Sequence, residues 1–527
     1  MAIVPMQGEM DLDEFRIRGR QLIEWIADYL ENPERYPVLS RSQPGEIISQ
    51  LPASPPEDPE VMVDILADFE QIILPGITHW NHPGFLAYFG ITGSGPSILG
   101  ELLTASLNVN AMLWRTSPAA TELEELTLDW LGQMIGLPAE FKGVITDTAS
   151  ISSLLAIAAA REATGLDIRQ QGMAGRPDLP RLRLYTTNQT HSSIEKAAIT
   201  LGIGLDGVRK LPVDENFAMD PYELARAVAE DIEDGWRPFC VVATVGTTST
   251  ASVDPISLIA QTCQLHDLWL HVDGAYGGMA AILPEFQHIL EGVGGADSFV
   301  VNPHKWLFTS IDCSAFYVQQ PSRLKTTFCL VPEYLKSGEE GVNNYMDWGV
   351  QLGRRFRALK LWMVIRHFGL SGLQNRIREH IRLGQDFAGW IDVEPGFQRL
   401  APAPLSVVCF RACPSDLWEM LGEASPEMKE KIEEYLEQLN RAIIDSVNES
   451  GEIFLSATEL NGVYSLRVAI GNIRTDESWV LKTQGLLKEA LLSIDAYLRP
   501  ASLRPDSLRP GSLRTDSLQP EEKDDGA

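Results

Sequence analysis

The sequence predicts an α/β protein in which a large domain with a mostly parallel sheet precedes a small α+β domain. Short apolar runs alternate with helical stretches from Gly143 to Val318, as they do in parallel sheets covered by helices. After a long helical stretch at 353–390 the pattern changes to strands, two of which flank the hairpin signal Asn461-Gly462. We therefore expect a large domain over residues 91–375 and a small domain over 376–495.

A helical arm is expected over residues 1–90. From Asp11 the apolar residues fall at helical spacing, and after a proline-rich link (44–59) a second helix ends at Pro75-Gly76. Two helices cannot bury their apolar faces by themselves. The arm should therefore pack on the main domain or on a second subunit.

Helix-capping residues and apolar runs predict the helices and strands after residue 90. Ser117-Pro118 and a capping-box pair, Thr121 and Glu124, mark the start of a helix. Strands are predicted in the large domain at Val144–Thr146, Leu182–Thr186, Phe239–Val245, Leu268–Asp273, Ser298–Val301 and Cys313–Val318, and in the small domain at Leu405–Phe410, Ile453–Thr458 and Val463–Ile470. The last segment, 496–527, repeats Ser-Leu-Arg-Pro, and its regular proline excludes a helix. It is expected to be a disordered appendage without a part in catalysis, with a docking role as the less favoured alternative.

Composition narrows the classes of function. The formal net charge of −29 argues against nucleic acid and anionic membranes as partners, because both bind basic patches. No apolar run reaches the ~18–20 residues of a membrane span, and the N-terminus lacks the features of a secretory signal. The cysteines show no paired spacing. A cytoplasmic protein without disulfides is predicted.

Two charged side chains at predicted strand ends suit one particular chemistry. Lys305 could form a Schiff base with pyridoxal phosphate (PLP), while Asp273 keeps the pyridine nitrogen of that cofactor protonated. The apolar neighbours of Lys305 should lower its pKa and so favour imine formation. A salt bridge between the two residues explains them equally well when they are taken alone.

Three further strand ends carry polar residues that a PLP site needs. Thr148-Ala149-Ser150 opens a helix and could cradle a phosphate, His191 could stack on the pyridine ring, and Thr248 could reach the cofactor. Each of these features is common in structural roles. Their joint placement at the carboxyl edge of one sheet favours a ligand site.

The chain resembles the PLP-dependent group II amino-acid decarboxylases, the family of aromatic-L-amino-acid decarboxylase, from about residue 11 to about 495. The matching segments are Pro75–Trp80, Phe85–Phe89, Ser117–Glu124, Thr148–Ser150, His191–Glu195, His271–Tyr276, Asn302–Trp306 and Leu352–Arg357. The resemblance implies the aspartate-aminotransferase-like fold (fold type I), an amino-acid substrate and an obligate homodimer with active sites at the interface.

The resemblance also implies roles for individual residues. Lys305 would be the Schiff-base lysine and Asp273 the pyridinium partner, with His191 and Ala275 on the two faces of the ring. The phosphate would be held by Ala149, Ser150, Asn302 and His304, with Thr148 in the same turn and Thr248 near the ring.

Tyr345 would be the acid that protonates the substrate Cα, on a lid-like stretch, Leu335–Asp347. Family members that make aldehydes commonly replace this tyrosine or the ring-stacking histidine. Because both are retained here, decarboxylation to the amine is favoured, with aldehyde synthesis as the alternative.

The substrate is predicted to be aromatic: tryptophan, tyrosine, phenylalanine or DOPA. Trp80, Tyr88 and Phe89 match pocket positions of the family, and Met112 replaces a phenylalanine of animal relatives. Relatives that act on glutamate, histidine or diaminobutyrate share the core motifs, so a non-aromatic amino acid is the second substrate alternative.

Two other classes of function compete with this interpretation. A metal hydrolase could use His79 and His82 with His271 and Asp273, but it leaves Lys305 unexplained, and no metal is expected. A PLP-binding scaffold without activity would show decay at Lys305, His191 or Tyr345, and none is visible.

Overall fold

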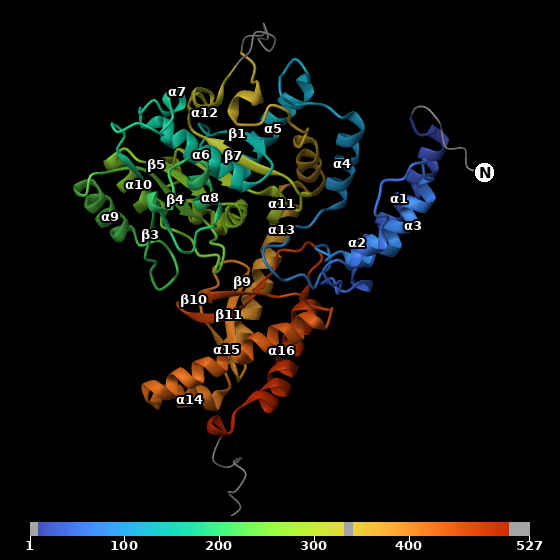
Figure 1. Ribbon diagram of the computed structural model, residues 1–527, viewed down its shortest axis with the longest axis vertical. Coiled ribbons are helices and arrows are strands. Elements are labelled where there is room, and N and C mark those ends of the chain that lie inside the picture. The colour runs from blue at the N-terminus through green and yellow to red at the C-terminus, as the bar shows by residue number, and fades with distance from the viewer. Residues whose placement is uncertain (1–8, 331–340, 505–527) are drawn as a thin grey trace, which may run out of the picture.

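The computed structural model describes residues 9–330 and 341–504, which form a large domain, a small domain and an N-terminal arm (Figure 1). The large domain contains a seven-stranded sheet in the order β1-β7-β6-β5-β4-β2-β3. Its strands are β1 (Lys142–Thr146), β2 (Arg181–Thr187), β3 (Val208–Leu211), β4 (Trp236–Thr244), β5 (Trp269–Asp273), β6 (Ser298–Val301) and β7 (Ser314–Val318). Strand β7 runs antiparallel to its neighbours β1 and β6, and the other pairs are parallel.

This sheet confirms the α/β prediction, and the six strands predicted for the large domain are present. The edge strand β3 was not predicted, because it is short and presents Arg209 and Lys210 rather than a continuous apolar run. Helices surround the sheet: α5 (Pro118–Ile135), α6 (Ala149–Ala163), α7 (Ile168–Gln171), α8 (Ser193–Thr200), α9 (Pro221–Glu233), α10 (Ile256–His266), α11 (Pro303–Trp306) and α12 (Pro321–Phe328). Helix α4 (Gly95–Leu107) packs instead on the long helix that joins the two domains.

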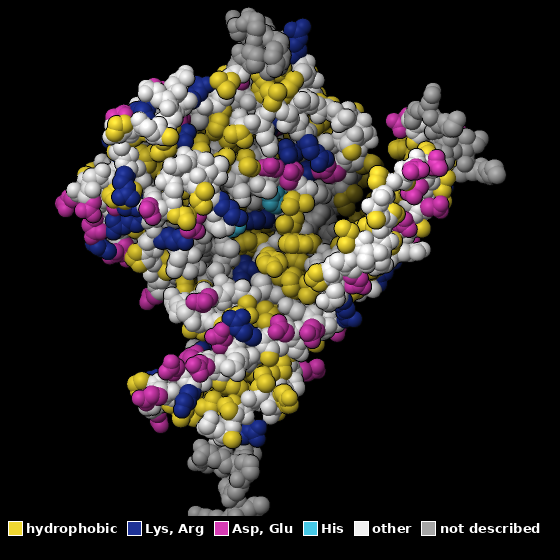
Figure 2. Space-filling view, in the orientation of Figure 1, with side chains coloured by type: hydrophobic (Ala, Val, Ile, Leu, Met, Phe, Trp, Pro, Cys, Tyr) yellow, Lys and Arg dark blue, Asp and Glu magenta, His cyan; other side chains and the backbone are white. Residues whose placement is uncertain are grey.

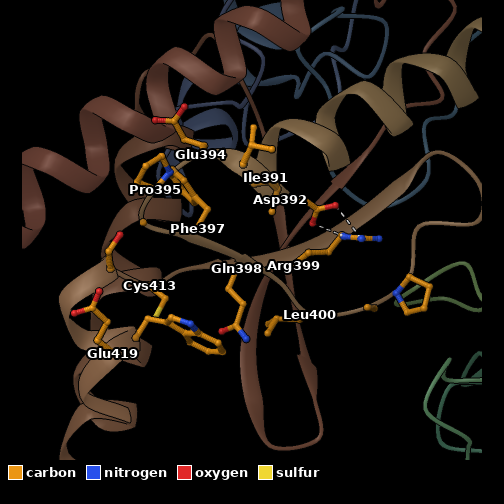
Figure 3. Close-up of a pocket in the computed structure, with 16 residues that line it drawn as sticks. Ile391, Asp392, Glu394, Pro395, Phe397, Gln398, Arg399, Leu400, Cys413 and Glu419 are labelled. Carbon is orange, nitrogen blue, oxygen red and sulfur yellow. Dashed lines mark hydrogen bonds and ion pairs between the residues drawn. The ribbon is translucent and has the colours of Figure 1, made fainter. Parts of the chain in front are cut away.

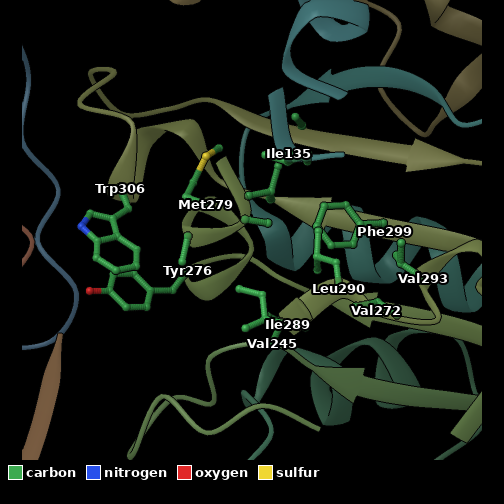
Figure 4. Packing of buried hydrophobic residues seen from close by; sticks show 14 of the residues in the cluster. Ile135, Val245, Val272, Tyr276, Met279, Ile289, Leu290, Val293, Phe299 and Trp306 are labelled. Carbon is green, nitrogen blue, oxygen red and sulfur yellow. The ribbon is translucent and has the colours of Figure 1, made fainter. Parts of the chain in front are cut away.

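The large core lies between the sheet and these helices. Figure 4 shows Ile135 of α5 facing Val272 and Phe299 of the central strands, with Tyr276 stacked on Trp306 at the edge of the cluster. Close packing here holds the segments after β5 and β6, which carry Asp273 and Lys305, in fixed positions.

A long helix, α13 (Ala358–Val393), joins the two domains. Its backbone is broken at Gly369, where φ is 62°, a value that glycine adopts without a Cβ clash. The predicted domain boundary at 375 falls inside this helix, so α13 contributes to both domains.

The small domain confirms the predicted α+β unit. Its antiparallel sheet has the order β10-β11-β9-β8, with β8 (Phe397–Arg399), β9 (Val407–Ala412), β10 (Ser456–Leu460) and β11 (Val463–Ala469), packed against α14 (Ser415–Glu423), α15 (Pro426–Glu449) and α16 (Glu477–Leu498). Asn461 and Gly462 both have positive φ, as a two-residue hairpin turn requires. Strand β10 starts later than predicted, because Phe454 forms backbone hydrogen bonds with Gly84 and Leu86 instead of pairing with β11.

The predicted tail boundary at 496 differs from the structure. Helix α16 continues to Leu498, Arg499 pairs with Asp416 and Asp495, and Leu503 is only 2% exposed. Residues 496–504 are therefore part of the small domain. The rest of the predicted disordered tail, 505–527, lies outside the described residues.

The arm consists of α1 (Leu12–Glu31), α2 (Glu46–Gln50) and α3 (Met62–Asp68), beside the two domains in Figure 1. Helix α1 has no buried residue, although it has a clear apolar side. Among the described residues, no helix is long and apolar enough to cross a membrane.

Candidate active site

A cavity of about 410 Å³ lies at the carboxyl edge of the large sheet. The segments after β1, β2, β4, β5 and β6 all reach it, because these strands point the same way across the sheet. Every residue predicted to hold the cofactor lines this cavity: Thr148, Ala149, Ser150, His191, Thr248, Asp273, Ala275, Asn302, His304 and Lys305.

Lys305 lines the cavity from the short helix α11, directly after β6. Burial lowers the pKa of its amine below the usual value; the Asp273 carboxylate opposes this effect and the Arg467 guanidinium adds to it. The amine is 5.0 Å from the centre of the Phe89 ring. A lysine in this environment supplies an uncharged nucleophile more readily than one in water.

Asp273 ends strand β5 and is 4% exposed. Its carboxylate accepts a hydrogen bond from the Ala275 amide at 3.0 Å. No ion pair joins Asp273 to Lys305 within residues 9–330 and 341–504, although both line the cavity. The carboxylate is thus free to face a ligand, and a simple salt bridge does not account for the pair.

His191 lies at the open side of the cavity, in the loop after β2. Its Nδ1 accepts a hydrogen bond from the Ser193 amide at 3.2 Å and lies 2.9 Å from the Ser193 hydroxyl. Partial burial lowers the pKa of this imidazole. The neutral ring then carries its proton on Nε2.

One end of the cavity is built to accept an anion. The amides of Ala149 and Ser150, at the N-terminus of α6, donate no hydrogen bond to any acceptor in the described part of the chain. His304 is neutral, because burial lowers its pKa to about 3, and its Nδ1 accepts from the Cys313 amide at 3.0 Å. Its Nε2–H is therefore a donor toward the same space, beside Asn302.

Aromatic side chains form another part of the lining, called the aromatic wall here. Trp80, Tyr88 and Phe89 line the cavity as predicted, with Phe89 stacked on Tyr276 at 3.9 Å between ring centres. Met112 does not line it. That side chain packs with Leu113 and Met346, because its loop turns toward the segment around residue 346.

Tyr345 also lies outside the cavity lining. It begins a short 3-10 helix (Tyr345–Trp348), is 3% exposed, and packs against Trp348 and the Arg354 guanidinium. Burial raises the pKa of its hydroxyl well above the usual value. Tyr345 therefore does not line the cavity of its own chain, and its expected role as proton donor stays a prediction; residues 335–340 of the predicted lid lie outside the described residues.

Several lining residues were missed from the sequence. Tyr276 follows the Asp273 segment and could have been found from its position, whereas Ile91, Ser249 and Ile311 carried no signal. The small domain adds Ser456, Ala457, Thr458 and Arg467. Nothing in strand periodicity shows that a second domain reaches the same edge.

The histidines proposed for a metal are otherwise engaged. His79 Nδ1 lies 3.0 Å from the Tyr29 hydroxyl, and His82 Nδ1 accepts from the Gly84 amide at 2.9 Å. Among the residues that the structure describes, no group of three or more His, Cys, Asp or Glu side chains could hold a metal ion.

A larger hollow, about 730 Å³, lies in the small domain between the end of α13, β8 and α14 (Figure 3). Its lining includes Phe397, Cys413 and Glu419, and the Asp392 carboxylate there is paired with Arg399 at 2.8 Å. None of the predicted site residues borders it, so the chemistry belongs to the cavity at the sheet edge.

Comparison with known proteins agrees with this geometry. Residues 44–413 match the model of the pyridoxal-dependent decarboxylase conserved domain. Tyrosine decarboxylase 3 of Petroselinum crispum is 40% identical over 93% of this chain and 94% of its own, and phenylacetaldehyde synthase of a Rosa hybrid cultivar is 38% identical over 91% and 94%. The crystal structure of Oryza sativa TDC with PLP and tryptamine superposes with a TM-score of 0.86 at 34% identity, covering 93% of this chain and all of that one.

The chain belongs to the family of pyridoxal-dependent decarboxylases, its fold is that of the fold type I PLP enzymes, and its cofactor is PLP. The residues that line the cavity also fit PLP by their own chemistry. A lysine amine of lowered pKa, an unpaired carboxylate and a set of free amides with a neutral histidine match the aldehyde, the ring nitrogen and the phosphate of the cofactor.

Proposed function

We propose that this protein decarboxylates an aromatic L-amino acid to the corresponding amine and carbon dioxide. The observation that carries the proposal is the joint lining of one cavity by Lys305, Asp273 and the aromatic wall of Trp80, Tyr88 and Phe89. The amine and carboxylate serve the reaction, and the wall sets the class of side chain. Relatives named for tyrosine and tryptophan support the aromatic assignment.

Each lining residue has a separate role in binding the cofactor, set by its position in the cavity. When bound, PLP accepts the electron pair that carbon dioxide leaves behind. Lys305 would hold the cofactor through its amine, and Asp273 would keep a proton on the ring nitrogen. The Ala149 and Ser150 amides with His304 Nε2–H hold the phosphate, which anchors the ring.

His191 and Ala275 bound the two faces of the ring in this proposal. The neutral imidazole presents Nε2–H toward the open side of the cavity, where a substrate carboxylate enters. Orientation matters because the bond to the departing carboxylate must stand perpendicular to the ring. Thr248 and Asn302 complete the lining around the cofactor, and Thr148 opens the helix that faces the phosphate.

Aldehyde synthesis is the second candidate. A relative of 38% identity is named phenylacetaldehyde synthase, and Tyr345, our expected proton donor, is buried outside the cavity. The product of the reaction depends on whether the substrate Cα is protonated or oxidised. Amine and hydrogen peroxide must therefore be measured together.

The test is a panel of tryptophan, tyrosine, phenylalanine, DOPA, glutamate and histidine, assayed for carbon dioxide, amine and peroxide. We expect carbon dioxide and amine from at least one aromatic substrate, and a loss of at least about 10³-fold in Lys305→Ala. The matched control, Lys210→Ala, changes an exposed lysine on β3. Turnover of only the non-aromatic substrates, or full activity of Lys305→Ala, would disprove the proposal.

A homodimer with the active sites near its interface is also proposed. Four leucines on α4, namely Leu99, Leu102, Leu103 and Leu107, are each about half exposed, and α1 exposes Leu12, Phe15 and Ile17. Figure 2 shows hydrophobic side chains along the arm and across the hollow between the arm and the two domains. Such continuous apolar area favours burial against a second copy of the chain.

Sedimentation of the full chain at micromolar concentration tests the dimer. We expect the wild type to sediment as a dimer and Leu102→Asp/Leu103→Asp to shift it toward the monomer. A monomeric wild type would refute the proposed dimer.

We further propose a cytoplasmic location, which the six free thiols support and cell fractionation would check.

A further inference from the structure

Arg467 is a buried cation in the active-site cavity, and no carboxylate pairs with it in residues 9–330 and 341–504. Its side chain lies on β11 of the small domain, and the residue is 3% exposed. Its Nη2 makes no hydrogen bond within the same residues. Burying an unpaired guanidinium is unfavourable, so its presence here calls for a functional reason.

The guanidinium joins the small domain to two segments of the large domain. Its Nε donates to the Ser249 carbonyl at 2.9 Å, and its Nη1 donates to the Tyr88 carbonyl. Its Cζ lies 4.7 Å from the centre of the Phe89 ring, within cation–π range. Ser249, Tyr88 and Phe89 all line the cavity.

The contact with Tyr88 acts on a strained residue. The φ of Tyr88 is 51°, in the left-handed region that an aromatic residue rarely adopts. Arg467 binds its carbonyl, and the Ser456 hydroxyl accepts a hydrogen bond from its amide at 3.2 Å. Two residues of the small domain thus hold the backbone that places the exposed Tyr88 ring beside Trp80, 6.1 Å away.

The Phe89 ring relates Arg467 to Lys305. The Lys305 amine is 5.0 Å from its centre and the Arg467 Cζ is 4.7 Å from it, so the two charges are at most about 10 Å apart. A second cation at this distance disfavours protonation of the lysine. The charged and titratable side chains that share the cavity with Lys305 are Asp273, His191, His304, Arg467, Tyr88 and Tyr276. Asp273 favours the protonated amine, and Arg467 is the permanent charge that opposes it.

We propose that Arg467 is a positioning residue, which holds the Tyr88–Phe89 wall in place and sets a permanent positive charge within about 10 Å of the Lys305 amine, where it disfavours protonation. The inference deepens the proposed function and rests on it for the role of Lys305. Arg467 acts through other residues, because its guanidinium donates its hydrogen bonds to the backbone carbonyls of Tyr88 and Ser249.

The first test measures the charge state of Lys305 without cofactor or turnover. The rate at which acetic anhydride acylates Lys305 in the cofactor-free protein, followed by mass spectrometry from pH 6 to 11, gives the midpoint of its titration. We expect Arg467→Met to raise this midpoint by about one pH unit, from Coulomb's law at an effective dielectric constant of about 20. Arg467→Lys keeps the charge and should leave the midpoint within about 0.3 of the wild-type value.

Arg411→Met is the matched control. Arg411 is also a buried arginine of the small sheet, on the neighbouring strand β9, but it pairs with Glu433 and lies outside the cavity lining. This variant loses stability because a buried arginine is removed, but the titration midpoint of Lys305 should not change. An unchanged midpoint in Arg467→Met, or an equal rise in Arg411→Met, would overturn the inference.

The second test addresses the wall. Arg467→Lys lacks the planar fork that reaches both carbonyls, so KM for the aromatic substrate should rise about tenfold while kcat falls by less than about threefold. Ser456→Ala should raise KM in the same direction, because it removes the other hydrogen bond to the Tyr88 backbone. Unchanged KM in both variants would refute the positioning of Tyr88.

The two hypotheses fail separately. A wild-type protein that decarboxylates no aromatic amino acid refutes the proposed function, and the acylation midpoint still decides whether Arg467 controls Lys305. An active wild type with no midpoint shift in Arg467→Met refutes the inference and leaves the proposed function intact.

Discussion

Two tyrosines near the predicted site lie in opposite surroundings. Tyr88 is 54% exposed at the mouth of the cavity, and Tyr345 is 3% exposed beneath Trp348 and Arg354. The sequence pattern around each tyrosine does not separate them. Their exposure does separate them: within one copy of the chain, packed side chains enclose the Tyr345 hydroxyl away from the cavity, whereas Tyr88 lines it.

Tyr345→Phe is therefore expected to leave the product unchanged. The substitution removes one hydroxyl from a buried site, and the ring keeps its contacts with Trp348 and Arg354. Amine and peroxide, assayed side by side on the preferred substrate, should keep their wild-type ratio within about twofold. A switch from amine to peroxide and aldehyde would return Tyr345 to the role of proton donor and contradict its placement outside the cavity.

At the scale of elements, buried polar pairs determine how neighbouring segments meet. Glu124 of α5 is 1% exposed and does not complete the predicted capping box. Its carboxylate instead accepts hydrogen bonds from the Ile145 amide at 2.8 Å and from Arg354 at 2.6 Å. The N-cap of α5 is provided by Ser117 alone, through the Ala120 amide. The Glu124–Arg354 pair fixes α5 and β1 against the segment that leads into α13.

Glu124→Gln should destabilise the protein strongly. The change leaves the Arg354 guanidinium buried without a countercharge, which costs about 3–5 kcal/mol. Urea unfolding at pH 7, followed by circular dichroism, should show the loss. The control is Glu379→Gln, in an exposed i,i+3 pair with Arg382, where the cost should stay below about 1 kcal/mol. Equal effects of the two changes would show that burial does not amplify the Glu124 pair.

At the scale of the whole molecule, the end of the described chain closes the small domain. Arg499 contacts α14 through Asp416 and α16 through Asp495, and Leu503 enters the core of the small domain. The first copies of the repeat, within 498–504, therefore have a core to pack against.

Two truncations test how far this packing extends. A chain that ends at residue 504 should keep wild-type activity and urea stability. A chain that ends at 498 should lose about 2 kcal/mol or more of its free energy of unfolding. It exposes the part of the small-domain core that Leu503 covers and removes the ion pairs of Arg499 with Asp416 and Asp495. Loss of stability on ending at 504 would show that residues beyond it also pack on the body.

Acid should destabilise the whole molecule through buried histidines. Burial lowers the folded-state pKa of His271 to about 4 and of His380 to about 3, whereas the pKa of both is near 6.5 when the chain is unfolded. The unfolded chain then binds more protons below about pH 6.5, so stability is complete above that pH and falls as the pH drops. Between pH 7 and 5 each histidine should cost about 2 kcal/mol.

Urea midpoints at pH 7 and pH 5 measure this loss. Asp254, whose pKa burial raises to about 6, acts in the opposite direction and returns only about 1.4 kcal/mol over the same range. His380→Gln should reduce the loss by about 2 kcal/mol, because an amide does not titrate and can still accept the hydrogen bond from Trp306. A flat profile from pH 7 to 5 would contradict the burial of neutral histidines.

The amino-acid sequence by itself determined the class of this protein and the set of strand-end residues that line the cavity. Apolar runs identify strands, and a side chain that directly follows a parallel strand must lie at the carboxyl edge, so strand order alone brings Lys305, Asp273 and His191 together. Only the tertiary structure showed where Arg467, Met112, Tyr345 and residues 496–504 lie relative to the cavity and the small-domain core. Their surroundings are made by contacts between segments far apart in the chain, and neither strand nor helix periodicity contains information about such contacts.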